Sequence, residues 1–327
     1  MVINLFKIKP HLFSIVILIN FFVIYTAKAK EHLDLNSIEE NLSIATLMSN
    51  TNSLKFGFAN YDLQINDPGF GTEETQLYKN GLDAITIPYT WELEPKSDAW
   101  DHAITVRAYY ISSKRNNEIV AGTSDQLHNH TFGLYGNYSQ YFHITDKWYV
   151  ESAFGTHLTF YKNNYDYGDG VSNSIKSDYD GQLFNTTALV AMIEPQVGIG
   201  YKKQQQWGTW RAHHNINYVY GHGIGGSVKR RDSINPEAWH ITNGIEFNIK
   251  APNVWGIDDF FSIDFKRVEV IGDLDVMAEK SYYYETSFGW VIDTNNAISL
   301  LDNIGFGLAI NYGSSVSGGS LILYFNE

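Results

Sequence analysis

Residues 148–160 read WYVESAFGTHLTF, and apolar side chains fill every second position over most of this stretch. A repeat of two puts these side chains on one face of a β-strand and leaves Glu151, His157 and Thr159 on the other face. Trp148 and Phe160 are 12 positions apart. A strand tilted by about 45° rises roughly 2.3 Å per residue, so this spacing covers ~28 Å. The apolar band of an outer-membrane β-barrel is ~25 Å tall, with aromatic residues at both edges, and the segment therefore predicts a membrane-crossing strand.

The same alternation returns along most of the chain between residues 82 and 325. We expect about twelve strands when the segments 54–65, 130–143, 208–221 and 319–325 are included. The connections between them alternate in length: 66–81, 113–129, 162–183 and 222–236 are long, whereas 95–101, 144–146, 203–207 and 251–258 are short. After residue 271 the alternation is expected to fade, since 272–280 and 294–302 each hold nine residues. Long loops at one end and short turns at the other indicate an all-β, antiparallel up-and-down transmembrane β-barrel of about 12 strands.

A soluble β-sandwich would also alternate apolar and polar positions, but its strands are usually only about 5–6 residues long. Trp210 and Tyr220 stand 10 positions apart and repeat the membrane-spanning arrangement of aromatics. The membrane barrel is therefore favoured. One residue fits it poorly, because the phase of this strand puts His214 on the lipid face unless a bulge intervenes.

The N-terminal 29 residues resemble a secretory signal peptide. Lys7 and Lys9 precede an apolar run over 12–25, and Ala27-Lys28-Ala29 supplies a small-x-small cleavage pattern. Cleavage would remove three lysines and change the net charge from −13 to −16. An acidic exported chain without a basic block is not expected to bind nucleic acid. The chain has no cysteine, which excludes disulfides and thiolate metal sites.

Residues 30–52 precede the barrel, which we assign to 53–327. Ser37 and Glu40 fit a capping box, and apolar residues follow at helical spacing, so a short N-terminal helix is predicted over about 37–49. A barrel of twelve strands leaves a lumen of roughly 12 Å after inward side chains, and a helix is ~10–12 Å across. One helix could therefore fit inside as a plug, and a helix at the membrane surface or a frayed terminus is an equal alternative.

The last strand carries Gly319, Leu321, Leu323 and Phe325 at alternate positions, and this pattern resembles the C-terminal assembly signal of outer-membrane barrels. With the strand number and the helical lead-in, the chain resembles the solitary outer-membrane autotransporter β-barrel family, whose members lack a passenger. The resemblance implies a bacterial outer-membrane location, contact with outer-membrane lipid and the barrel assembly machinery, and a monomeric, non-enzymatic barrel. Only 30–52 separate the signal from the first strand, too few for a folded passenger.

The expected lumen face carries both charge signs, which suits an occluded barrel better than a selective pore. The lumen-lining candidates are Arg107, Arg211, Lys266, Glu92, Glu151, Glu194, Glu246 and Glu285. The inward cations could pair with Glu39 and Glu40 of the helix. A small porin is the main alternative.

Two patterns invite other chemistry. The segment His240-Ile241-Thr242-Asn243-Gly244 is similar to the His-x-Ser-Asn-Gly motif of outer-membrane phospholipase A, but here threonine replaces the serine nucleophile and the phase turns His240 and Thr242 inward. Asp166, Asp169, Asp178 and Asp180 lie in the longest loop, where a solvated acidic loop is a better interpretation than a Ca²⁺ site. We therefore expect no catalytic residues, no metal and no cofactor.

Overall fold

The computed structural model describes residues 33–50, 54–56, 82–116, 125–168, 176–251, 258–273, 281–298, 301–313 and 318–325. The chain divides into two compact units, Met1–Leu33 and Asp34–Glu327. The second unit holds the fold described below. The predicted signal peptide lies outside the described residues. No described helix combines the length and apolar character needed to cross a membrane.

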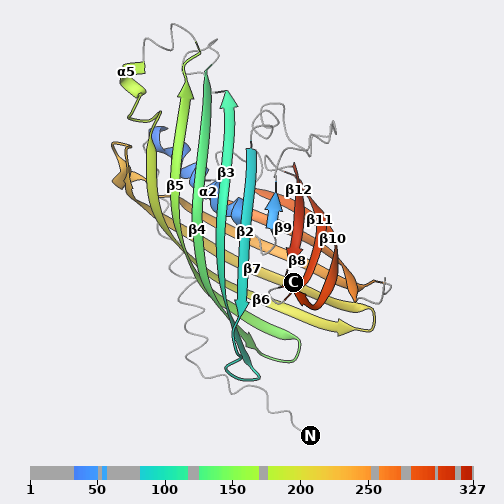
Figure 1. Ribbon diagram of the computed structural model, residues 1–327. Helices are drawn as coiled ribbons and strands as arrows, with labels where there is room; N and C mark the ends of the chain where they lie inside the picture. The colour runs from blue at the N-terminus through green and yellow to red at the C-terminus, as the bar shows by residue number, and fades with distance from the viewer. Residues whose placement is uncertain are drawn as a thin grey trace. The chain divides into compact units, whose positions relative to one another are not determined.

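Twelve strands of the described chain pair in an antiparallel ring, in which each strand is bonded to its neighbours in sequence and β1 closes on β12 (Figure 1). The all-β, up-and-down barrel is confirmed. The strands are β1 (Leu54–Phe56), β2 (Leu82–Glu92), β3 (Trp100–Asn116), β4 (Gln126–His143), β5 (Trp148–Asp166), β6 (Thr187–Gln205), β7 (Gly208–Gly226), β8 (Glu237–Lys250), β9 (Asp259–Gly272), β10 (Tyr282–Ile298), β11 (Leu301–Tyr312) and β12 (Gly318–Phe325). A helix, α2 (Leu33–Ser49), precedes them, with α5 (Lys176–Tyr179) and η2 (Arg231–Ser233) in two connections.

The period of two sorts side chains between the outside of the ring and its interior. On β5, Phe154 and Leu158 are 52% and 48% exposed, whereas the intervening His157 is 3% exposed. Apolar side chains therefore face outward and polar ones inward, the reverse of a soluble protein and the arrangement that lipid requires.

At one end of the ring, each connection is shorter than the connections before and after it at the other end. The short ones are 93–99, 144–147, 206–207, 251–258 and 299–300. The predicted connection 294–302 is wrong, because β10 and β11 continue their pairing beyond the apolar pattern, from Asp293 opposite Asn303 to Ile298 opposite Leu301. A register shift between these two pairs accommodates the polar end of the hairpin. After residue 271 the connections are 273–281, 299–300 and 313–317, and the last is shorter than the short connections 93–99 and 251–258. Beyond Phe56, the predicted strand 54–65 lies outside the described residues.

Inward glycines give room to aromatic side chains of the neighbouring strand. A Cβ atom added to Gly133 would lie 1.9 Å from the Cζ atom of Tyr109, and one added to Gly155 would lie 2.5 Å from the Cε2 atom of Tyr135. Each tyrosine therefore lies flat over a glycine on the adjacent strand, which fixes the register of β3, β4 and β5.

Candidate functional site

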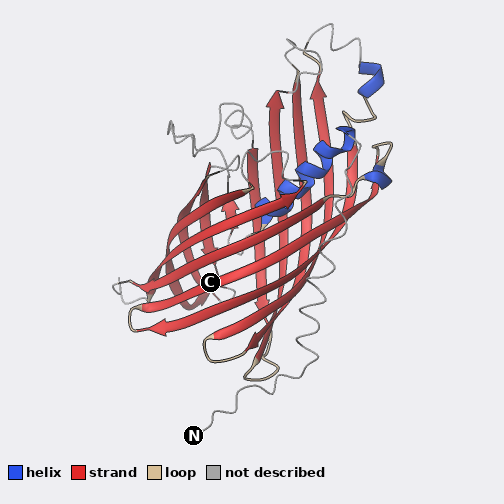
Figure 2. Ribbon diagram, turned by 180° about the vertical axis from the view of Figure 1, so that it is seen from behind, coloured by secondary structure: helices blue, strands red, loops and turns tan. Residues whose placement is uncertain are grey.

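The interior of the ring is filled in part by helix α2, which lies behind strands in Figure 1 and in front of strands in the reversed view of Figure 2. Ile38 and Leu42 have no exposed surface, and they pack with residues of β5, β6 and β7. On the next turns, Ile44 and Leu47 pack against Tyr109, Tyr135 and other inward residues of β2, β3, β4, β8, β9 and β10. Because wall residues surround the helix, its polar positions are buried too.

The helix begins four residues earlier than predicted, and the proposed capping box is wrong. Ser37 lies inside the helix, and its carbonyl oxygen accepts a hydrogen bond of 2.6 Å from the Asn41 amide nitrogen. The apolar pattern used for the prediction began at Ile38, and the helical backbone begins before that pattern, at Leu33.

The direction of the helix is fixed by its contacts. Near its start, the Glu39 carboxylate accepts a 2.5 Å hydrogen bond from the backbone N–H of Asn235, and Ile38 packs in the same cluster as Ile234. Both partners belong to the long connection between β7 and β8. At the other end, Leu47 and Asn50 line a cavity that extends toward the short turns. The helix thus begins at the long-loop end and stops midway through the lumen.

A chain of buried hydrogen bonds joins the helix to three strands. The Tyr161 hydroxyl donates to Asn129 Oδ1 at 2.6 Å, Asn129 Nδ2 donates to Ser113 Oγ at 3.0 Å, and Ser113 Oγ donates to Asn41 Oδ1 at 3.1 Å. All four side chains are at most 5% exposed. We call these four residues the polar ladder. It positions the helix at one depth and one rotation, because buried polar groups need their partners.

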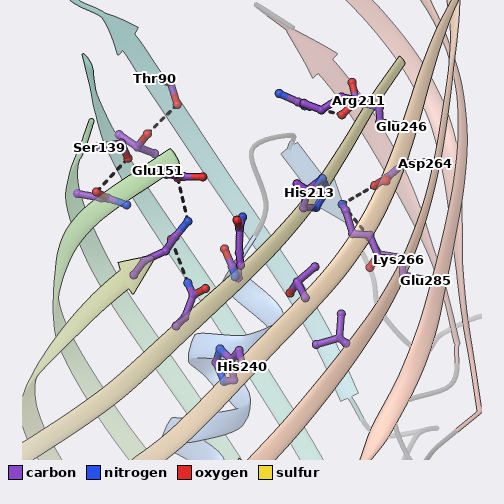
Figure 3. A pocket seen from close by; sticks show the side chains of 18 of the residues that line it. Thr90, Ser139, Glu151, Arg211, His213, His240, Glu246, Asp264, Lys266 and Glu285 are labelled. Carbon is purple, nitrogen blue, oxygen red and sulfur yellow. Dashed lines mark hydrogen bonds and ion pairs between the residues drawn. The ribbon is translucent and has the colours of Figure 1, made fainter. Parts of the chain in front are cut away.

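Below the helix, two adjoining cavities of about 270 Å³ and 670 Å³ share lining residues and reach toward the short-turn end. Figure 3 shows the charged side chains that converge there from β7, β8, β9 and β10. Arg211 forms an ion pair with Glu246, and Lys266 pairs with Asp264 and, at 3.7 Å, with Glu285. The charges are thus cross-linked between strands, and the cavities carry both signs.

The remaining lumen candidates occupy separate places. Arg107 is buried over the Tyr135 ring, with its guanidinium carbon 4.5 Å from the ring centroid. Glu151 accepts a 2.8 Å hydrogen bond from Gln196, and Glu92 is exposed in the larger cavity at the short-turn end. The ion pairs of Arg211 and Lys266 described above join residues of the wall.

Glu194 belongs to a buried network that the sequence analysis missed. Its carboxylate accepts hydrogen bonds from His157 Nε2 at 2.7 Å and from Asn217 Nδ2 at 2.6 Å. Asp264, the ion-pair partner of Lys266, was missed as well. The alternation of apolar and polar positions puts His157, Asn217 and Asp264 on inward faces, so the sequence pattern could have identified them as lumen residues. Their partners depend on strand register, which the alternation does not give.

The phospholipase-like segment faces the lumen. His240 is 1% exposed, neither ring nitrogen has a hydrogen-bond partner in the described chain, and Thr242 lines the smaller cavity. Asn243 points outward, where its Oδ1 lies 2.8 Å from His214 Nδ1. His214 therefore does face outward, without a bulge, and takes its partner from the next strand. An acyl-transfer nucleophile needs an adjacent base and access to lipid, and the Thr242–His240 pair has neither.

No group of three or more potential metal ligands occurs among the described His, Asp and Glu residues. Of the four loop aspartates, Asp180 accepts a hydrogen bond from Asn185 and Asp166 is exposed, whereas Asp178 lies in α5 and Asp169 lies outside the described residues.

Sequence comparison places this barrel in a family. The model described as solitary outer membrane autotransporter beta-barrel domain matches residues 39–327. The chain belongs to this family. The resemblance noted from the strand pattern and the last strand is thereby confirmed, and the protein is an autotransporter-type β-barrel of the outer membrane. The match begins inside α2 and includes residues 39–49 of this helix.

Three solved structures of autotransporter domains are similar to this chain at low sequence identity. The transport unit of AIDA-I from Escherichia coli is 10% identical, with a TM-score of 0.49, 88% of this chain covered and 99% of that one. The translocator domain of NalP from Neisseria meningitidis is 9% identical, with a TM-score of 0.49 and coverage of 90% and 98%. The beta domain of the Bordetella autotransporter BrkA is 10% identical, with a TM-score of 0.42 and coverage of 74% and 90%. No curated protein sequence matches the chain.

Proposed function

We propose that this autotransporter barrel is a non-enzymatic outer-membrane barrel that works without a passenger domain and whose pore is occluded by its own helix α2. The description of its family as solitary supports the first part. The observation that carries the second is the complete burial of Ile38 and Leu42 between the helix and the inner wall.

Dimensions support the occlusion. A lumen of roughly 12 Å is nearly filled by one helix, and the 17 residues of α2 extend over about 25 Å along its axis. An ion passing from the long-loop end would have to move between packed side chains. The cavities below the helix are wide enough for water and ions, so the resistance to flow resides in the segment that the helix occupies.

Planar-bilayer conductance tests this proposal. The intact mature protein should conduct weakly, and deletion of 31–50 should raise the conductance several-fold. Both proteins must first show the shift in gel mobility on boiling that a closed barrel gives, because only inserted barrels are informative. Equal and low conductance of the two would contradict occlusion by the helix. Strong conductance of both would favour a small porin.

The direction of the helix adds a second test. Since α2 begins at the long-loop end, which faces outward in outer-membrane barrels, an epitope placed between Lys30 and α2 should bind antibody on intact cells. Binding only after the outer membrane is permeabilised would place the start of the helix on the periplasmic side and would reverse the proposed orientation.

A further inference from the structure

Four basic side chains gather on the outer surface of the barrel, just above its apolar band. We call Lys114, His128, His130 and Lys162 the basic patch. Lys114 and Lys162 are exposed, and the two histidines are half-buried. They come from β3, β4 and β5, the strands that reach furthest at the long-loop end in Figure 1. In a chain with 36 acidic and 23 basic residues, such a cluster stands out.

Strand register places the patch at the edge of the membrane. Tyr110, Phe132 and Phe160 lie opposite one another and form the last apolar row. The next row outward holds His130 opposite Lys162, and the row after it holds Lys114 opposite His128. Successive rows on one face are about 6.8 Å apart and neighbouring strands about 4.8 Å apart. The four side chains therefore start within an area of roughly 10 Å by 10 Å.

The last apolar row also orients the patch. The Tyr110 hydroxyl lies 2.9 Å from His130 Nδ1, with the two rings stacked at 6.2 Å. This contact holds the imidazole in place and leaves its Nε2 nitrogen for another partner. Acidic residues stand at the margin: Asp83 lies opposite Ser112, and Asp166 lies opposite Gln126. Within the two basic rows on β3, β4 and β5, no outward position is acidic.

We infer that the basic patch binds the phosphate groups of an outer-leaflet lipid, the phosphorylated glucosamine headgroup of lipid A. The long-loop end faces outward in barrels of this kind, so the patch stands at headgroup depth in the outer leaflet. Lysine and protonated imidazole form charge-assisted hydrogen bonds with phosphate oxygens, and an anion nearby favours the protonated imidazole. The acyl chains of the same lipid would lie on Phe132 and Leu134, which are 52% and 62% exposed. Phosphate above an aromatic edge and acyl chains below it match the two ends of such a lipid.

The test measures lipid binding to the detergent-purified full-length barrel by native mass spectrometry. Titration with bisphosphorylated lipid A should give a discrete complex that Lys114→Gln/Lys162→Gln weakens at least tenfold, since two charge-assisted contacts are lost. The matched control is Lys147→Gln/Lys202→Gln, which removes two exposed lysines at the short-turn end and should bind like the unchanged protein. Lys114→Arg/Lys162→Arg, which keeps the charges, should also bind.

Two further binding measurements identify the source of the phosphate. Dephosphorylated lipid A should bind at least tenfold more weakly than the bisphosphorylated form, and millimolar inorganic phosphate should not displace the lipid. Equal binding by the glutamine and control variants, equal binding of dephosphorylated lipid, or full displacement by inorganic phosphate would each overturn the inference, the last by indicating a simple anion site. Gel mobility before and after boiling confirms folding. Should the lysine variant not fold, His128→Gln/His130→Gln is judged by the same tenfold criterion.

Discussion

Replacing Ser113 by alanine should loosen the hold of the wall on helix α2. Ser113 is the middle of the polar ladder, donating to Asn41 of the helix and accepting from Asn129 of β4. Alanine removes both contacts without adding volume. The hydrogen bond with Asn129 is lost whether the helix is docked against the wall or undocked, so this loss does not change the free-energy difference between the two states. The loss at Asn41 occurs only in the docked state.

The size of the effect follows from that one contact. A buried hydrogen bond whose acceptor is left without its donor is worth about 1–2 kcal/mol. At 1.4 kcal/mol for each factor of ten, the population of barrels with the helix undocked should rise about 5- to 30-fold. Amide hydrogen exchange of residues 37–49 should accelerate by the same factor where it depends on undocking. The fraction of time spent open in single-channel recordings should increase equally.

Ser112→Ala provides the matched control. Ser112 precedes Ser113 on β3 but faces outward, so the chemical change is the same and the helix contact is untouched. Equal exchange and equal open time for Ser112→Ala, Ser113→Ala and the unchanged protein would refute the idea that the ladder holds the helix.

Other expected outcomes concern the wall, the chain end and the enzyme alternative. Gly133→Ala should lower the stability of the barrel by about 1–3 kcal/mol in urea unfolding, because its Cβ would meet a buried tyrosine ring, whereas Gly136→Ala, with no atom within 4 Å, should be near neutral. Lys266→Met should cost about 2 kcal/mol in the same assay by leaving two carboxylates without their cation. Phe325→Ala should reduce the amount of barrel in outer-membrane fractions, and unchanged levels would remove the last strand as an assembly signal. His240→Ala should leave the acyl chains of phospholipid and lipid A unchanged in lipid mass spectrometry.

The barrel could be predicted because lipid and lumen impose a strict period of two, and that period is visible in one sequence. The register could not, since it depends on which residues of two strands lie opposite each other. The hydrogen bonds of Glu194 with His157, and of Asn243 with His214, depend on how neighbouring strands are aligned. The polar end of β10 was missed for a related reason: beyond the membrane, a strand no longer needs apolar residues on either face.

The sequence did not decide whether the helix lies inside the barrel, and the physical reason is a different one. Sequence patterns place a helix by assuming that one face meets water, whereas α2 is enclosed on all sides by a wall that is partly polar. Ser43, Thr46 and Ser49 are buried although they resemble surface positions. The carbonyls of Ser43 and Thr46 accept hydrogen bonds from Thr46 and Ser49, so two of these hydroxyls are satisfied within the helix itself.

The enclosure of α2 also makes its helical structure depend on the closed ring. The segment holds three acidic residues and no lysine or arginine, and most of the stability of a helix in a protein comes from tertiary packing. The wall supplies that packing to Ile38 and Leu42, which have no exposed surface. Changes that loosen the ring should therefore also lower the helix content of residues 33–49.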